Sequence, residues 1–404
     1  MFDHWFAAQE PRVSSWLGAL HAMPETGFCE EGTARFVAEQ LQELGFEVAT
    51  GLGGTGVVGT LDGFGGAGRT IGLRAELDAL PMSGAAMSGD GATHRNRFHG
   101  CGHDGHMTIV LCAAAYLAAH REFSGTLRVI FQPAEELLSG ARAMLSDGLF
   151  THYPVDEIYA LHNLPGLAPG HVAIPAGTVL ASADDVDVTI RADGAHGAMP
   201  NTGQDAMLAA AAFVTGAQQA ATRVLDARDA AVVSFGALWG GTARNILPAQ
   251  VDLAGTLRAA DDTARDRLRA ALQDVGRGVA AAHGLGVDVR ISAVAPRTVN
   301  HPACAGAVID AAGRIAGAEC VQTDARPLMA SEDFAEMLSD VPGAYAFIGQ
   351  GGAPLHHPEY RFDPALIPLG AALLADIVMA RGPTLTTTRK KDDQQKLSPA
   401  GDPL

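Results

Sequence analysis

The chain has 404 residues, of which 48% are hydrophobic and 18% charged, and its formal net charge is −17 at pH 7. This composition is typical of a well-buried globular protein and argues against a disordered one. At about 100–200 residues per domain, the length predicts two or three domains. The acidic balance, without a cluster of Lys and Arg, argues against nucleic acid or an anionic membrane as the main partner.

The cysteines and the N-terminus indicate the compartment. The first residues include acids and no apolar signal segment, and no run reaches the roughly 18 apolar residues of a membrane span. The cysteines are odd in number and widely spread, which favours reduced thiols over a disulfide framework. We therefore expect a soluble, cytoplasmic protein with free thiols at Cys29, Cys101, Cys112, Cys304 and Cys320.

Predicted strands and helices alternate over the first 180 residues. Apolar residues at helical spacing cover 29–45 and 105–120, and a shorter helical stretch surrounds 136–146. Short β-rich runs cover 55–61, 70–75, 127–133 and 157–165. This order predicts an α/β fold with a mostly parallel sheet flanked by helices, in which ligands bind outside the carboxyl ends of the strands.

The pattern changes near residue 180 and returns near residue 295. Between them the order is βαββαβ, with strands at 184–194, 230–240, 250–259 and 286–294 and helices at 202–225 and 261–282. A strand at 344–349 and a helix at 363–380 follow. We expect a discontinuous domain of residues 1–180 and 295–382, an inserted ferredoxin-like α+β domain of residues 181–294, and a disordered tail over 383–404.

Four clusters of metal-compatible side chains lie near the predicted strand ends. Taken singly, each has an ordinary structural interpretation: a buried Cys with a polar loop His, a solvated pair of glutamates, or a core histidine. Together they exceed the three or four ligands of one zinc ion, which favours two divalent ions that share a water. The clusters are Cys101 and His103 in a loop, Glu135 and Glu136, His162, and His356 beside His357.

The chain resembles the M20 metallopeptidases from about residue 10 to residue 380. The resemblance is to the amidohydrolase branch, which includes hippurate hydrolases, aminoacylases and plant hydrolases of auxin–amino acid conjugates. It implies a two-metal exopeptidase-like catalytic domain with an inserted lid or dimerisation domain. The segments that carry it are "GLRAELDALP" (72–81), "FHGCGHDGHM" (98–107), "FQPAEE" (131–136), "ALHNLPGL" (160–167), "DGAHGAMP" (193–200), "GGTARNILPAQVDLAGTLR" (240–258), "ASEDFAEM" (330–337) and "LHHPEYRFD" (355–363).

The resemblance also implies roles for individual residues. Glu135 matches the general base that takes a proton from the water and delivers it to the leaving amine, and Asp78 matches an acidic residue behind the metals. His196 matches a histidine that reaches the substrate carbonyl, sometimes across a dimer interface. Asn245 and Arg258 match residues that bind the substrate carboxylate. The implied metal ligands are Cys101, His103, Glu136, His162 and His356.

Three positions depart from the family pattern. Glu76 stands where Asp is more frequent, Asn201 where a second His often follows "MP", and Ala330 where Gly usually precedes "SEDF". None of them is an implied ligand or the base. We therefore expect them to affect the shape of the pocket and not the reaction.

The expected activity is hydrolysis of the amide bond of an N-acyl amino acid, with an acetyl, benzoyl or other aryl or alkyl acyl group. The expected cofactors are two divalent ions per subunit (Mn²⁺, Zn²⁺, Co²⁺ or Ni²⁺), and the expected assembly is a homodimer or higher homo-oligomer. A dipeptidase or carboxypeptidase, or an aryl amine deaminase, would use the same metals. A non-enzymatic binding protein is the alternative of a different class, and the intact Glu135 argues against it.

Overall fold

The computed structural model describes residues 2–84, 96–175 and 177–382. Its main element is an eight-stranded sheet. The inner pairs β4–β3, β3–β5 and β5–β16 are parallel, whereas β1, β2 and the short β6 pair antiparallel with their inner neighbours. The strand order is β1 (Glu47–Leu52), β2 (Gly56–Asp62), β4 (Thr126–Gln132), β3 (Thr70–Glu76), β5 (Glu157–Pro165), β16 (Gly343–Gln350), β6 (Val172–Ala173), β15 (Val321–Gln322). The predicted α/β class is confirmed.

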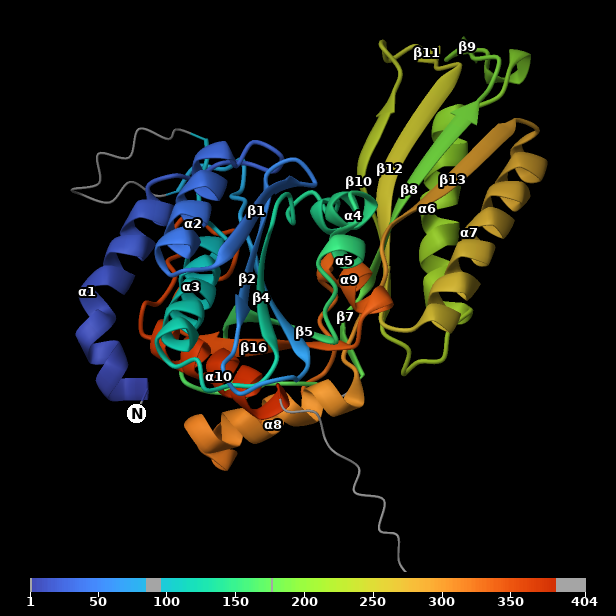
Figure 1. Cartoon of the computed structure of the whole chain (residues 1–404). Helices are drawn as coiled ribbons and strands as arrows, with labels where there is room; N and C mark the ends of the chain where they lie inside the picture. The colour runs from blue at the N-terminus through green and yellow to red at the C-terminus, as the bar shows by residue number, and fades with distance from the viewer. Residues whose placement is uncertain (1, 85–95, 176, 383–404) are drawn as a thin grey trace, which may run out of the picture.

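Helices cover both faces of this sheet (Figure 1). Strand side chains alternate between two apolar cores: Val57 and Val129 belong to one, and Val58 and Ile130 to the other. The helices of the first core are α1 (Phe2–His21), α2 (Glu31–Glu43), α3 (His103–Ala119), α8 (Pro302–Ile315) and α10 (Leu366–Arg381). Those of the second are α4 (Gly140–Ser146), α5 (Leu149–His152) and α9 (Phe334–Asp340).

A separate four-stranded antiparallel sheet lies beside the main one. It has the predicted βαββαβ order, and α6 and α7 cover a single face of it (Figure 1). Asp205 and Asp261 cap the two helices by accepting hydrogen bonds from backbone N–H groups three residues on. The elements are β8 (Ser182–Arg191), α6 (Ala206–Arg223), β10 (Ala231–Gly240), β12 (Gln250–Ala259), α7 (Asp262–His283) and β13 (Gly286–Ala295), and the sheet order is β10-β12-β8-β13.

Several short elements complete the described residues. The ribbon of β9 (Ala195–His196) and β11 (Ile246–Leu247) lies at the end of the four-stranded unit far from the main sheet (Figure 1). The pair β7 (Thr178–Leu180) and β14 (Thr298–Val299) lies where the chain passes between the two sheets, and η1 (Pro200–Thr202) and η2 (Ala318–Cys320) are single 3₁₀ turns. In the described ranges, none of the helices combines the length and the hydropathy of a membrane-spanning segment. The expected disordered tail, 383–404, falls outside them.

Two expectations about local structure were wrong. The stretch after β4 was expected to be helical from about residue 136, but residues 135–138 form turns and α4 begins at Gly140. His103 was expected in a non-helical loop, but it is the first residue of α3. In both places a tight turn precedes the helix, and apolar periodicity does not register such turns.

Candidate metal centre

Cys101 and His103 are brought to the carboxyl ends of the central strands by a left-handed glycine. Gly102 has φ +92°, and a Cβ atom there would clash with the Tyr360 hydroxyl and with Asn163. Only glycine therefore fits between the two side chains. α3 is buried along most of its length, which holds His103, its first residue, against β3 and β5.

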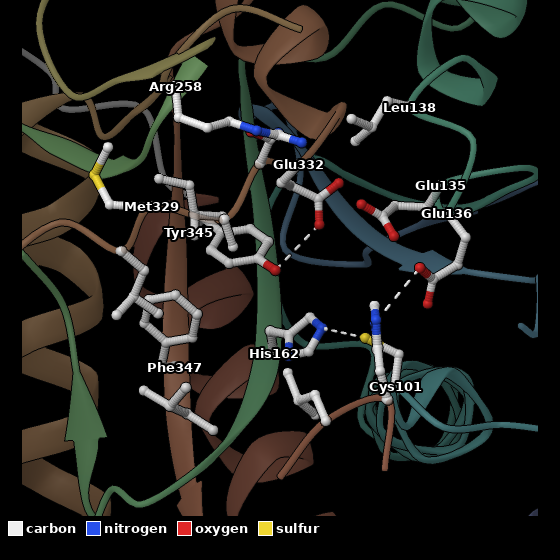
Figure 2. A pocket seen from close by; sticks show the side chains of 17 residues that line it. Cys101, Glu135, Glu136, Leu138, His162, Arg258, Met329, Glu332, Tyr345 and Phe347 are labelled. Atoms are coloured by element: carbon white, nitrogen blue, oxygen red, sulfur yellow. Dashed lines mark hydrogen bonds and ion pairs between the residues drawn. The ribbon is translucent and has the colours of Figure 1, made fainter. Parts of the chain in front are cut away.

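The five implied ligands form two groups that share one sulfur. The ligand atoms of Cys101, His103 and His162 lie within 4.8 Å of one another, and so do those of Cys101, Glu136 and His356. Figure 2 shows Cys101, Glu136 and His162 pointing into one space. His356 Nε2 lies 3.6 Å from a Glu136 carboxylate oxygen, and His356, not His357, lines the cavity. The structure thus brings all five side chains together.

The two buried imidazoles are oriented for a metal. Nδ1 of His103 lies 2.8 Å from the carbonyl oxygen of Asp78, and Nδ1 of His162 lies 2.7 Å from that of Asn163. A carbonyl can only accept, so each Nδ1 donates, and in the neutral imidazole Nε2 is the nitrogen that carries the lone pair. Histidine ligands typically donate their other ring N–H in this way. Nε2 of His103 and Oε1 of Glu136 are buried and have no hydrogen-bond partner within the described part of the chain, so the donor set fits divalent ions.

Glu135 lies beside this donor set. Its carboxylate is 3.8 Å from Nε2 of His103, and its side chain is 9% exposed. Burial raises the pKa of Glu135 well above its ordinary value, and the nearby charges of Glu332 and Glu136 raise it further. Burial also raises the pKa of Glu136, to about 7. A carboxyl group in such surroundings can both accept and return a proton near neutral pH.

A buried charge network supports the floor of the site, and sequence reasoning missed it. Arg74 on β3 is fully buried and donates to Glu332 at 2.8 Å, to Gln132 at 2.7 and 2.9 Å, and to Glu76. Tyr345 donates to Glu332 at 3.1 Å, as Figure 2 shows. The adjacent acids Glu332 and Asp333 in "ASEDFAEM" were the available signal, because two acids before an apolar stretch need partners if they are buried.

His106 belongs to a second layer behind the ligands. Its Nδ1 lies 2.8 Å from Glu76, and its Nε2 lies 2.7 Å from the Oδ1 atom of Asn163. Asn163 in turn donates to Tyr360 at 2.7 Å. These contacts connect β3, β5 and α3 beneath the five side chains. Glu76, the departure from the family pattern, therefore acts on the packing behind the site.

A cavity of about 470 Å³ opens from the donor set. Arg258 on β12 lines it and donates to the hydroxyl of Ser331. The wall opposite the acids is apolar, and Figure 2 shows Met329 and Phe347 on that side. The apolar lining residues are Leu138, Leu164, Leu180, Leu328, Met329, Phe347 and Leu355. The arrangement can hold a molecule with an apolar end and an anionic group.

His196 and Asn245 lie outside this cavity. His196 is exposed on β9, and it lines a different cavity with Thr242 and Ile246 at the far end of the four-stranded unit. Asn245 is also exposed, and its carbonyl accepts a hydrogen bond from Gly197 at 2.8 Å. The two residues are therefore near each other but are not brought to the donor set within one chain.

The chain can be assigned to a family of peptidases. Residues 72–380 match the family described as Peptidase family M20/M25/M40, and the chain belongs to it.

Curated relatives and a solved structure resemble the chain over most of its length. The hippurate hydrolase of Campylobacter jejuni is 36% identical over 361 residues, covering 89% of this chain and 94% of that protein. The N-acetyl-L-cysteine deacetylase of Bacillus subtilis is 33% identical, and the match covers 86% of this chain and 83% of that protein. The structure of the Bacillus subtilis YXEP protein is described as a dinuclear metal-binding peptidase of the M20 family. It superposes on this chain with a TM-score of 0.81 at 28% identity, and the match covers 93% of this chain and 98% of that one.

Proposed function

We propose that the protein is a metal-dependent amidohydrolase that cleaves N-acyl amino acids into a carboxylate and a free amino acid. The observation that carries this proposal is the pair of ligand groups sharing Cys101, with Glu135 beside them and an apolar cavity in front. Relatives named for the hydrolysis of hippurate and the deacetylation of N-acetyl-L-cysteine support the same reaction class.

Two divalent ions would be held by the five side chains of the two ligand groups, Cys101, His103, Glu136, His162 and His356. When bound, they would activate water and polarise a carbonyl group. Mn²⁺, Zn²⁺, Co²⁺ and Ni²⁺ all accept a donor set of imidazole, carboxylate and thiolate. That the bound ions are one or two of these four is part of the proposal.

The proton is handled by Glu135. Its carboxylate accepts the proton of the attacking water and delivers it to the nitrogen of the leaving amine. Its buried position favours this cycle, because burial makes the protonated form accessible near neutral pH. Asp78 positions the neighbouring groups: its carboxylate accepts a hydrogen bond from the backbone N–H of Glu136 at 2.9 Å and lies 3.3 Å from Nδ1 of His103.

The acyl group would lie against the apolar wall, and the amino acid carboxylate near Arg258. Burying apolar surface is worth about 25 cal/mol per Å², so a benzoyl or branched alkyl group gains more from this wall than an acetyl group. Burial lowers the pKa of Arg258 somewhat, but a guanidinium remains charged at neutral pH and suits a carboxylate. The substrate class is therefore an N-acyl amino acid with an apolar acyl group.

A second copy of the chain would supply His196. Within one chain His196 and Asn245 are exposed and do not line the cavity of the donor set. β9, which carries His196, and β11, which follows Asn245, lie at the end of the four-stranded unit far from the main sheet (Figure 1). The neighbouring β10 is an edge strand that exposes Val232, Leu238 and Trp239, which is a surface suited to pairing with another strand. We infer a homodimer in which the inserted domain of residues 181–294 brings His196 to the substrate carbonyl of the partner's catalytic domain, residues 1–180 and 295–382.

A substrate panel on metal-reconstituted protein tests the proposal. N-benzoyl and N-acetyl amino acids should be hydrolysed, hydrolysis should stop on chelation, and Mn²⁺, Co²⁺ or Zn²⁺ should restore it. The Glu135→Gln variant should keep its metals and lose a factor on the order of 100 or more in kcat. Preference for dipeptides would indicate a peptidase instead, and an unchanged Glu135→Gln variant would contradict the assignment of the base.

A further inference from the structure

The loop that carries Glu135 and Glu136 is held in an unfavourable backbone conformation. Ala134 has φ 50° and Leu138 has φ 49°, so two non-glycine residues on either side of the glutamates lie in the left-handed region. Such residues are energetically unfavourable and persist only where the surroundings fix them. Something outside the loop must therefore stabilise residues 133–141.

Three buried carboxylates provide that stabilisation. Each accepts a hydrogen bond from a different backbone N–H of the loop or of the first turn of α4, which follows it: Glu30 from Ala134 at 2.8 Å, Asp78 from Glu136 at 2.9 Å, and Asp333 from Ala141 at 2.9 Å. All three side chains belong to residues with 0% exposure. They come from separate parts of the chain, before α2, after β3 and before α9. The loop is thus fixed at its beginning, its middle and its end.

Glu30 has the clearest role in this arrangement. It lies directly before α2, and its second oxygen accepts a hydrogen bond from the Thr55 hydroxyl at 2.7 Å. Hydrogen bonds to ionised acceptors are about twice as strong as neutral ones, and a buried N–H left unpaired destabilises the conformation that holds it. Losing the Glu30 acceptor would free Ala134 to leave its left-handed conformation. Glu135, the next residue, would then move.

We propose that Glu30 and Asp333 are positioning residues for the general base: together with Asp78 they hold the loop so that the Glu135 carboxylate faces the reacting atoms. The inference rests on the proposed role of Glu135. A base displaced by about 1 Å can lose on the order of 100-fold in rate. Neither residue lines the cavity, and each accepts a hydrogen bond from the backbone around the glutamates. A carboxylate oxygen of Asp333 also lies within 4.8 Å of one of Glu135, so Glu30 is the residue that tests positioning through the loop alone.

Three substitutions at Glu30 and one control test the proposal in the full-length, metal-loaded enzyme. Glu30→Ala removes the acceptor and should lower kcat by about 10- to 100-fold while KM and the metal content stay within about twofold of wild type. Glu30→Gln keeps an oxygen for Ala134 and should restore most of kcat. Glu30→Asp, which shortens the side chain by one methylene, should fall between them and serves if Glu30→Ala does not fold. Thr55→Val removes only the second hydrogen bond.

The control separates positioning from general stability. Thr55→Val should lower the unfolding temperature and leave kcat within about twofold, because the Ala134 bond remains. Equal kcat losses in Thr55→Val and Glu30→Ala, or wild-type kcat in Glu30→Ala, would overturn the inference. The rates are measured on whichever amide the wild type hydrolyses. A wild type that prefers dipeptides would therefore contradict the proposed substrate but leave the comparison of variants intact.

Discussion

The sulfur of Cys101 lies 3.4 Å from Nε2 of His162, on the side of the imidazole opposite the nitrogen bonded to the backbone. The same sulfur belongs to the second ligand group with Glu136 and His356. Burial raises the pKa of the Cys101 thiol, so binding of a divalent ion at this sulfur would release its proton. The sulfur is the one ligand atom shared by both groups.

This sharing predicts unequal effects on metal content. Cys101→Ala removes a ligand from both groups and should lower the bound metal from about two ions per subunit to below one. His162→Ala and His356→Ala each remove a ligand from a single group and should each retain about one ion. Metal analysis after gel filtration measures the content. Two ions retained by Cys101→Ala would show that the sulfur is not shared.

The placement of His196 predicts complementation between two inactive variants. His196→Ala and Glu135→Gln should each be nearly inactive alone. After subunit exchange, about half of the dimers are mixed, and each has one complete site, so about a quarter of wild-type activity should return. Activity of the mixture before and after exchange is the measurement. No recovery would mean that His196 acts within its own chain or not in the reaction.

Much of the fold could be predicted from the sequence, because the spacing of apolar residues, every second residue in strands and about every 3.6 residues in helices, is a local property. The βαββαβ unit has the predicted order, and its strand ends differ from the predicted ones by only a few residues. The N-terminal helix α1 was missed. Pro11 interrupts its pattern, yet Val13, Trp16 and Leu20 pack into the core, and Trp16 donates to Gln40 at 2.6 Å. That packing depends on tertiary contacts, which a local pattern does not contain.

Part of the candidate site could also be predicted from local sequence, and part could not. Cys, His and Glu are conspicuous in an apolar sequence, so the ligand set could be proposed from spacing and resemblance. The adjacency of Glu332 and Asp333 was a signal of burial, but the roles of Glu30 and Asp333 toward the loop could not be proposed, because the backbone N–H groups that they accept from are more than 100 residues away in the sequence. A buried acid that accepts from a distant main chain leaves no local pattern. Only the three-dimensional arrangement identifies it.

The apolar wall predicts a change in acyl preference. Met329 lines the cavity and is half-buried, so Met329→Ala should leave the core intact while removing contact area for a large acyl group. We expect kcat/KM for N-benzoyl substrates to fall by about 3- to 10-fold, with little change for N-acetyl substrates, from about 1 kcal/mol of lost burial. Met379→Ala, at an exposed position on α10, is the control. A parallel loss for both substrates would place the acyl group elsewhere.

We expect Glu157, which lies away from the site, to make a pH-dependent contribution to the free energy of unfolding. Its carboxylate accepts hydrogen bonds from Arg69 at 2.9 Å, from Arg381 at 2.8 Å and from the Tyr159 hydroxyl at 2.7 Å. Burial alone would raise the pKa of Glu157, but Arg381, Tyr159 and Arg69 lower it below its ordinary value. The charged carboxylate therefore stabilises the folded state.

When the pKa of a carboxyl group is lower in the folded state than in the unfolded state, the group stabilises the folded state. The whole effect is present above the unfolded-state pKa, about 4.3 for Glu, and it is lost as the pH falls through the folded-state pKa. Glu157→Gln should therefore lower the free energy of unfolding by about 1–3 kcal/mol at pH 7. The difference from wild type should narrow below about pH 4. Urea unfolding across this pH range measures it. Glu43→Gln, at an exposed ion pair with Arg12, should change little at any pH, and a pH-independent deficit in Glu157→Gln would contradict the assignment.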